Sequence, residues 1–515
     1  MSALAPAVTT RGRGAGGGLD RQTLVIVAVV AIGLVMPALD TTIVNVALDR
    51  LAADLHASLA TVQWVSTAYL LSLAVVVPLS GWMEERFGSK RIWLISIGLF
   101  GAGSALCGLS ASIGELIGFR ILQGLGGGML IPVGFTLVTQ SAGPKKAGRV
   151  LSLVGVPILL GPIFGPIIGG LIVDNATWQW IFFVNVPIAV IGFGLAARVL
   201  SGAAGRSDAG RLDWRGAALL CPGLVGIVFG LSETEAHGGL VDPIAFVPIL
   251  AGTALVAAFV LCALRTQRPL IDVRLFRVPA FGAAAATAFL LAVGLFGAMI
   301  LLPLYYQLDR GESALAAGLL MAPQGLGAAV ALGISGRLTD AIGGGRVVLV
   351  GATVATLATI PWAFVGPATS QALLAALLFV RGVGMGASVQ PAAASALAVL
   401  TSAQVPRAAA ALNTIRQVGA SIGTAVAAVL LESQARVAMP SAGGGSGILE
   451  PLAPAARARV AVPLADAFHH AFAWVIAASA LAALGGLVLT VAERRARPAV
   501  ADVRLRRKAT AETGS

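Results

Sequence analysis

Ionisable side chains inside long apolar runs are the residues of this sequence best suited to chemistry. Asp40 lies in the apolar run that begins at Thr23, and Arg120 lies in the run 114–138. A charged side chain within a membrane costs at least about 2.5–3.5 kcal/mol, so such a residue usually faces a cavity or a partner. Burial disfavours the ionised form of Asp40, whereas a nearby cation favours it. This competition suits a carboxylate that takes up and releases a proton.

Arg120 is the natural electrostatic counterpart of Asp40. Its guanidinium stays protonated, so it can bias a carboxylate without titrating itself. The alternative for both residues is a structural role, in which they hold neighbouring helices together. Arg381 and Arg416 also lie within apolar runs, and for these two we favour a structural role. Glu432, near the end of a later run, could be a second acidic contact for a cationic substrate, although a solvated position at the membrane surface is the simpler interpretation.

The elements that position these residues are predicted to be membrane-spanning helices. The 515 residues are 57% hydrophobic and only 11% charged, whereas a soluble protein carries roughly 25% charged residues. Apolar runs of about 20 residues recur along the chain, which predicts helices rather than barrel strands. About fourteen such runs lie between 23 and 492. The first is too long for a signal peptide, so we expect a retained span.

The distribution of positive charge orients these spans. With an even number of spans, 27 of the 35 Lys and Arg residues fall on the side of the termini and five on the other side. Because positive residues concentrate in cytoplasmic loops, both termini are expected to be cytoplasmic. The formal net charge of +12 is then a topology signal rather than a sign of nucleic-acid binding. We expect a multi-pass protein of the cytoplasmic membrane with no nucleic-acid partner.

Two short loops share one pattern at a constant offset of 255 positions. The shared positions are glycine, carboxylate, glycine and arginine: Gly81, Glu85, Gly88 and Arg91 in the first loop, and Gly336, Asp340, Gly343 and Arg346 in the second. The repeat predicts two parallel halves of a transporter. A carboxylate is favoured beside a helix N-terminus, so the two acids could latch neighbouring helices in one state, with Arg86, Arg91 and Arg346 as partners. The alternative is turn glycines with ordinary cytoplasmic charge.

The repeat divides the chain into five predicted parts. These are a cytoplasmic tail (1–22), a six-helix bundle (23–200), an inserted helix pair with cytoplasmic linkers (201–279), a second six-helix bundle (280–492) and a basic cytoplasmic tail (493–515).

The segment "PILLGPIFGPIIGG" places helix-breaking residues inside an apolar run. Gly161, Gly165 and Gly169 recur every four residues and form one slanted stripe, which lets another helix approach closely. Pro162 and Pro166 lack N–H groups and should bend the span. We therefore expect a bent, tightly seated helix at the interface between the two bundles.

Several motifs resemble those of the major facilitator superfamily, in particular its fourteen-span drug:proton antiporter family. The similar segments follow one another along the chain: "LDTTIVNVAL", "GWMEERFGSKR", "RILQGLGGG", "GPIFGPIIGG", "WQWIFFVNVP" and "NTIRQVGASIG". Besides the residues already named, their signature positions are Asn45, Gln123, Gly124, Gly170, Asn185, Asn413, Arg416 and Gln417.

The resemblance implies an all-α fold of two six-helix bundles plus two inserted helices. It implies proton-coupled efflux of hydrophobic or cationic drugs or antibiotics by alternating access, driven by the proton gradient with no cofactor or metal. Arg120 would act in proton transfer or conformational coupling, and the "GPIFGPIIGG" motif marks exporters. We expect a monomer that is not an enzyme, with a periplasmic adaptor left open. The alternatives are a metabolite exporter, another symporter or antiporter of the superfamily, and a non-transporting membrane sensor.

Overall fold

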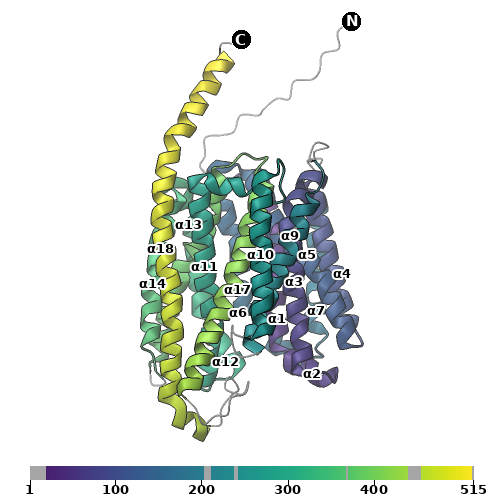
Figure 1. Cartoon of the computed structure of the whole chain (residues 1–515), viewed down its shortest axis with the longest axis vertical. Coiled ribbons are helices and arrows are strands. Elements are labelled where there is room, and N and C mark those ends of the chain that lie inside the picture. The colour runs from purple at the N-terminus through teal and green to yellow at the C-terminus, as the bar shows by residue number, and fades with distance from the viewer. Residues whose placement is uncertain (1–18, 202–209, 237–241, 367–368, 439–453, 513–515) are drawn as a thin grey trace.

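The chain folds into helices that run between two ends of the molecule (Figure 1). The computed structural model describes residues 19–201, 210–236, 242–366, 369–438 and 454–512, and every regular element within them is a helix. Thirteen helical segments are long and apolar enough to cross a membrane. The 29-residue α6 (Ala147–Asn175), which carries the glycine and proline repeat, is a further helix of spanning length. The prediction of an all-α membrane protein with about fourteen spans is confirmed.

The helices of the first half precede residue 201. They are α1 (Arg21–Val46), the short α2 (Leu48–Asp54), α3 (Leu59–Phe87), α4 (Ser89–Leu109), α5 (Ile113–Ala142), α6, the single-turn α7 (Trp180–Phe183) and α8 (Asn185–Val199).

An adjacent pair and the second half follow. The pair is α9 (Trp214–Ala236) and α10 (Pro243–Arg265). The second half contains α11 (Pro279–Leu304), the π-helical η3 (Tyr305–Asp309), α12 (Ala314–Leu320), α13 (Ala322–Ile342), α14 (Gly344–Thr359), α15 (Gln371–Gly386), α16 (Val389–Ala398), α17 (Val405–Ala438) and α18 (Pro454–Glu512).

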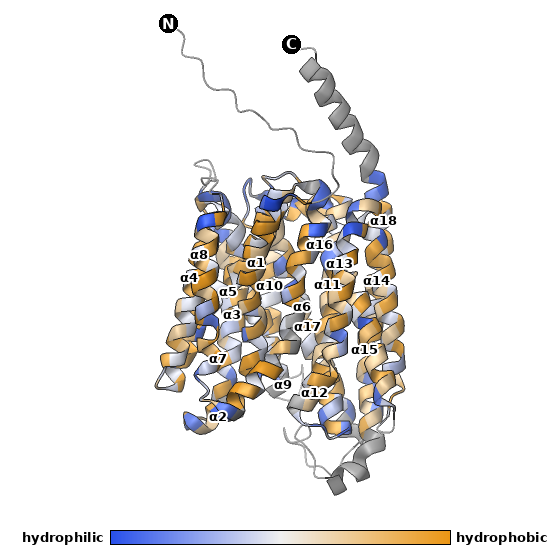
Figure 2. Cartoon of the chain, turned by 180° about the vertical axis from the view of Figure 1, so that it is seen from behind, coloured by the Kyte–Doolittle hydropathy of each residue, from blue (hydrophilic) through white to orange (hydrophobic). Residues whose placement is uncertain are grey.

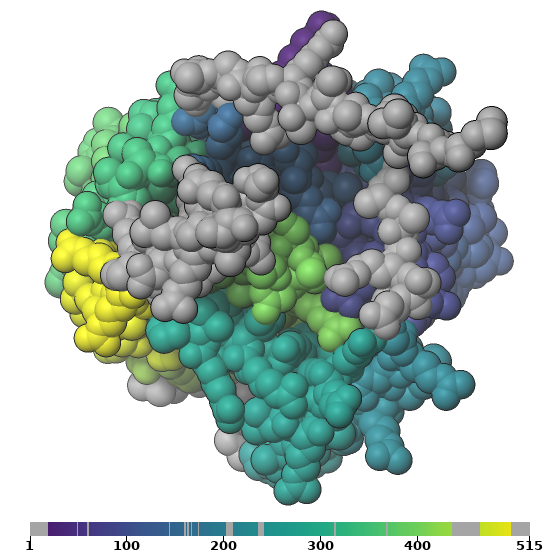
Figure 3. Space-filling view, turned by 90° about the horizontal axis from the view of Figure 1, so that it is seen from above, coloured from purple at the N-terminus to yellow at the C-terminus, as the bar shows by residue number. Residues whose placement is uncertain are grey.

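The two halves pack within themselves and meet along several helix pairs, two of which are the most extensive. In the first half α1 packs on α6 and α5 packs on α3 and α4, while in the second half α11 packs on α17 and α18. The halves meet where α6 packs on α13 and where α3 packs on α17. Seen from above, α17 (light green) lies near the middle of the face (Figure 3). The helix α9 rests against α3 and α17, and α10 packs on α9. The predicted part boundaries stay a prediction.

The surface of the helical bundle is apolar between its two ends. Figure 2 shows hydrophobic residues along the helix flanks and hydrophilic residues gathered towards the ends. Large apolar side chains such as Leu261, Val350 and Leu484 are exposed there. Because water would not favour so much exposed apolar surface, this belt fits a lipid environment.

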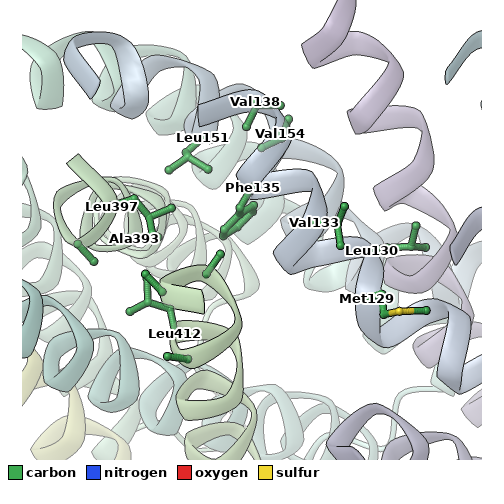
Figure 4. Close-up of a cluster of buried hydrophobic side chains, with 14 of the residues drawn as sticks. Met129, Leu130, Val133, Phe135, Val138, Leu151, Val154, Ala393, Leu397 and Leu412 are labelled. Carbon is green, nitrogen blue, oxygen red and sulfur yellow. The ribbon is translucent and has the colours of Figure 1, made fainter. Parts of the chain in front are cut away.

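We call the end at which α1 begins and α3 and α13 terminate the inner end, and the opposite end the outer end. One large apolar core joins both halves, and Figure 4 shows Phe135 of α5 close to side chains of α6, α16 and α17, including Leu151, Ala393 and Leu412. Two separate cores contain residues of only one half each, around Phe182 in the first and around Trp362 in the second. The continuous apolar contact between the two halves therefore lies towards the inner end.

The glycine stripe of α6 seats against α1. A methyl group added at Gly161 would lie 2.5 Å from the carbonyl oxygen of Ala38, and one at Gly165 would overlap the hydroxyl of Thr42. Thr42 donates a 3.2 Å hydrogen bond to the Gly161 carbonyl oxygen. The predicted close approach is thus present. The helix also lies at the interface between the halves, as predicted, because α6 packs on α13 and α16 of the second half, while the stripe itself faces α1 of its own half.

The side chains of Pro162 and Pro166 lie outside the described part of the chain, so the predicted bend stays a prediction. The contacts of α6 with the second half include its first turns and continue further along the helix, where a methyl group added at Gly155 would lie 2.5 Å from Gln390 of α16. A methyl group added at Gly148 would lie 2.7 Å from Thr339 of α13.

A leucine at position 165 tests the α1–α6 contact. Gly165→Leu should block the transport that the resemblance implies while the protein still inserts, because the side chain can be accommodated only by separating α1 from α6. Overpacking of this kind costs about 1–3 kcal/mol. Drug accumulation and membrane content measured together check this outcome. Gly194→Leu on α8, where an added methyl meets nothing within 4 Å, is the matched control. Normal export by Gly165→Leu would show that close packing is not required.

Candidate functional site

A buried ion pair joins α1 to α5 in the first half. Arg120 Nη1 donates to Asp40 Oδ2 at 2.5 Å, and the exposed fractions of the two residues are 1% and 0%. The Arg120 Nε donates to the Val65 carbonyl oxygen of α3 at 3.0 Å. The structure therefore brings together the two residues that the sequence pairs on electrostatic grounds.

Amide side chains complete the coordination of this carboxylate. Gln123 Nε2 donates to Asp40 Oδ1 at 2.8 Å, and Asn185 Nδ2 donates to the same oxygen at 3.2 Å. Gln123 also accepts from Arg120 through its Oε1 at 2.8 Å. Ser104 of α4 accepts from both amides at 3.2 Å. Both oxygens of the carboxylate are hydrogen-bonded, and the polar cluster around it joins five helices: α1, α3, α4, α5 and α8.

Glycines of the "RILQGLGGG" segment allow α5 to place Arg120 and Gln123. A methyl group added at Gly124 would lie 2.8 Å from the Tyr69 carbonyl oxygen of α3, and one at Gly126 would lie 2.5 Å from the Phe100 amide nitrogen of α4. On the opposite side, Gly103 of α4 would place a methyl 2.7 Å from the Gln123 Cα. The small residues therefore set the helix spacing on which the polar contacts depend.

Tyr69 and Ser104 belong to the site, although the sequence analysis did not identify them. The Tyr69 ring lies 4.2 Å from the guanidinium carbon of Arg120, which is a favourable cation–π geometry. The Tyr69 hydroxyl is buried and has no hydrogen-bond partner. A lone serine or tyrosine in an apolar run carries no sequence signal for such a contact.

A second set of charges links the halves at the inner end. Arg407 Nη2 of α17 donates to Glu85 Oε2 of α3 at 2.8 Å. Asp340 of α13 accepts from the Gly148 amide of α6 at 3.0 Å, and its other oxygen lies 3.7 Å from Arg149 Nε. We call these contacts the first lock (Glu85–Arg407) and the second lock (Asp340 with Gly148 and Arg149). Each carboxylate faces the first turn of a helix of the other half, as the helix dipole favours.

The lock partners correct one expectation. We expected Arg86, Arg91 and Arg346 to pair with the loop carboxylates, whereas Glu85 and Asp340 pair with arginines of the opposite half. Arg91 and Arg346 are exposed, and Arg86 has another interaction. The observed partners lie in the first turns of helices that are distant in the sequence, where no sequence motif indicates that they pair with these carboxylates.

The glycines of the two loops have matching geometry. Gly88 and Gly343 end α3 and α13 with φ of 88° and 94°, a region that favours glycine. A methyl group added at Gly81 would lie 2.9 Å from the Arg407 Cα, and one at Gly336 would lie 2.8 Å from the Arg149 Cα. Close backbone contact between the halves thus accompanies each lock.

Glu84 is a buried carboxyl that the sequence analysis missed. It is 3% exposed and accepts hydrogen bonds from Ser89 at 2.8 Å and from Thr136 at 3.3 Å. Its neighbour Glu85 occupies the motif position. Because the two acids are adjacent, the sequence alone could not indicate which of them is buried.

The remaining predicted residues lie outside these clusters. Asn45 accepts from Ser66 at 3.2 Å, Asn413 donates within its own helix and Gln417 donates to the Leu70 carbonyl oxygen of α3. Glu432 is half-buried and has an interaction of its own. Gly170 is buried on α6.

Metal-binding clusters are absent from the described part of the chain. No group of three or more His, Cys, Asp or Glu residues there is placed to hold an ion.

Comparison with known proteins places this arrangement in a transporter family. The model of the Major Facilitator Superfamily matches residues 30–424. A multidrug resistance protein B homolog of Mycobacterium tuberculosis is 39% identical over 473 residues, covering 89% of this chain and 87% of the relative. A putative multidrug resistance protein MdtD of Pectobacterium carotovorum is 32% identical over 425 residues, covering 81% and 89%.

Solved structures share the fold at low identity. The human organic anion transporter MFSD10 gives a TM-score of 0.60 at 18% identity, covering 91% of this chain and 100% of that one. The proton:xylose symporter XylE gives 0.59 at 15%, covering 90% and 94%.

The fold and the paired halves define a multi-pass membrane transporter of small molecules, not an enzyme. The chain belongs to the major facilitator superfamily.

Removing one member of the buried pair should destabilise the protein strongly. Arg120→Gln leaves Asp40 without its cation, and breaking a buried pair costs about 3–5 kcal/mol. The double variant Asp40→Asn/Arg120→Gln should lose less than the sum of the single variants. Thermal unfolding in detergent measures the loss of stability in the single variants and in the double variant. Additive losses would mean that the two residues contribute independently.

Exchanging the charges of the first lock tests its role. Glu85→Arg should slow drug export roughly tenfold, because like charges across an interface cost several kcal/mol, while the dissociation constant of a drug changes little. Export assays and binding by tryptophan fluorescence separate the two effects. The double variant Glu85→Arg/Arg407→Glu should recover export. Unchanged export in the single variant would contradict a gating role.

Proposed function

We propose that this protein exports hydrophobic drug-like molecules across the cytoplasmic membrane in exchange for protons. The names of the two relatives support the substrate class, since both are described as multidrug resistance proteins. The sequence signal from positive residues supports cytoplasmic termini. The driving force would be the proton gradient, with no cofactor, and the unit a monomer.

The observation that carries the proposal is the coordination of Asp40. The Asp40 carboxylate lies within a described span, forms an ion pair with Arg120, and accepts hydrogen bonds from the side-chain amides of Gln123 and Asn185. A proton arriving at Asp40 would neutralise it and release Arg120 from its strongest contact. Because the site joins five helices, protonation would favour a different arrangement of the first half, which is the linkage that coupling needs.

The locks supply the second element of the mechanism. Both join the two halves at the inner end, next to the continuous apolar core. We assign this arrangement to a state closed towards the cytoplasm. Alternating access then requires both locks to open while the outer ends of the halves approach each other. One proton moving down about 100 mV supplies about 2.3 kcal/mol for this cycle.

Proton release measured on the purified protein tests the proposal. Adding a transported drug to the wild type should release protons into a weakly buffered solution, and Asp40→Asn should release none because an amide carries no acidic proton. Reconstituted vesicles should show drug-dependent proton flux only for the wild type. Asp54→Asn, which makes the same change in the exposed pair of Asp54 with Arg50, is the control and should behave as wild type. Export by Asp40→Asn at the wild-type rate would refute the role of Asp40.

A further inference from the structure

The first lock has a third participant, in the linker that follows the pair α9 and α10. Arg407 donates through Nη2 to Glu85 at 2.8 Å and through Nη1 to the Pro269 carbonyl oxygen at 3.2 Å. Pro269 belongs to residues 266–272, which connect α10 to the 3₁₀ turn η2 (Val273–Arg277) ahead of α11. The guanidinium is therefore held on two sides, by a carboxylate of the first half and by a backbone carbonyl of this linker.

Asp213, directly ahead of α9, holds the linker in place. Its Oδ2 accepts from the Leu270 amide at 3.2 Å, and its Oδ1 accepts from the Gly216 amide at 2.9 Å. A methyl group added at Gly216 would overlap Oδ2 of Asp213. Glycine thus makes room for a carboxylate that serves the helix start and the linker together.

One peptide group bridges the anion Asp213 and the cation Arg407. The Pro269 carbonyl and the Leu270 N–H belong to the same planar trans unit, in which they point in opposite directions. An anion at the N–H and a cation at the oxygen polarise this unit in the same sense, so each hydrogen bond strengthens the other. The result is a chain of contacts that runs from Asp213 through the peptide and Arg407 to Glu85.

The linker is well anchored within the fold. Leu270 and Ile271 are 2% and 6% exposed and belong to the large apolar core. Arg274 of η2 donates to the carbonyl oxygens of Leu264 and Thr266 at 3.0 and 2.9 Å, which ties η2 to the end of α10. A displacement at the start of α9 therefore reaches the lock instead of being absorbed within the linker.

The pair α9 and α10 is placed at the first lock rather than at the second. The extensive contacts of α9 are with α3 and α17, the helices that carry Glu85 and Arg407. The second lock lies on α6 and α13, and its Asp340 carboxylate stands 3.7 Å from Arg149 Nε, compared with 2.8 Å in the first lock. The pair thus adds a support to one of two similar connections.

We propose that Asp213 is a positioning residue of the first lock, which it stabilises through the Pro269–Leu270 peptide and Arg407. The pair α9 and α10 then takes part in gating, because it helps to keep the inner end closed and must release or move this peptide when the inner end opens. The inference rests on the proposed function for its effect on export, whereas the contact itself can be tested without transport.

Hydrogen exchange of the purified full chain measures how often the lock opens. Asp213→Ser keeps an oxygen that caps α9, but a single oxygen cannot reach both amides, so the Leu270 N–H loses its partner. Amides at the end of α3 (81–88) and in the first turns of α17 (407–414) should exchange roughly tenfold faster, as expected for the loss of a hydrogen bond to a charged group. Asp272→Ser makes the same change at the start of η2. It is the matched control and should exchange as the wild type does.

A double-variant cycle distinguishes positioning of the lock from general structural support. Glu85→Gln removes the carboxylate of the lock, so Asp213→Ser should cause little further increase in exchange in that background. Additive increases would mean that Asp213 acts independently of the lock and would overturn the inference. Unchanged exchange in Asp213→Ser, or faster exchange confined to the first turns of α9, would overturn it as well.

Drug export by reconstituted vesicles tests the gating role separately. Asp213→Ser should slow export in the wild-type background but not further in Glu85→Gln. Faster exchange in both single variants with unchanged export would retain the positioning role and reject the lock as a gate. Slower export in Glu85→Gln, with exchange and export unchanged in Asp213→Ser, would retain the gate and reject the positioning role.

Discussion

A charged group inside a membrane must find its counter-charge within the protein, and the pair Asp40–Arg120 shows how this constraint organises the first half. The two side chains are fully enclosed, so the charged atoms of the pair need hydrogen-bond partners within the protein. Gln123 and Asn185 donate to the carboxylate, and Ser104 accepts from both amides. The polar cluster therefore fixes the mutual position of five helices that are otherwise held by non-directional apolar contacts.

Small residues make these directional contacts possible. Ion pairs and amide hydrogen bonds act over about 3 Å, so helices must approach closely wherever they occur. Glycines provide that approach beside Arg120 and beside both locks. The chain contains 64 glycines among 515 residues, and their recurrence at these places is a physical reason for that high glycine content. The family motifs contain few charged residues, and they are recognisable mainly because these glycines recur at fixed positions.

Features that depend on periodicity or on a local sequence pattern could be predicted from the sequence. Long apolar runs indicated the spans, isolated charges indicated Asp40 and Arg120, and the two loops indicated the paired halves. Partners distant in the sequence were not accessible: Arg407 lies 322 positions from Glu85, and Tyr69 and Ser104 look like ordinary residues of apolar helices. The glycine stripe of α6 predicted close packing but could not name α1 as its partner. Nor could the sequence indicate that the carbonyl oxygen of Pro269 accepts from Arg407.

The matching geometry of the two locks has a mechanical consequence. Each lock connects the end of a helix in one half to the start of a helix in the other, and the repeat makes the two connections equivalent. A rigid-body rotation that lengthens one connection lengthens the other as well. In the proposed cycle the inner end would then open as a single step with no half-open form. In the proton exchanger that we propose, such all-or-none closure would keep the membrane sealed between turnovers.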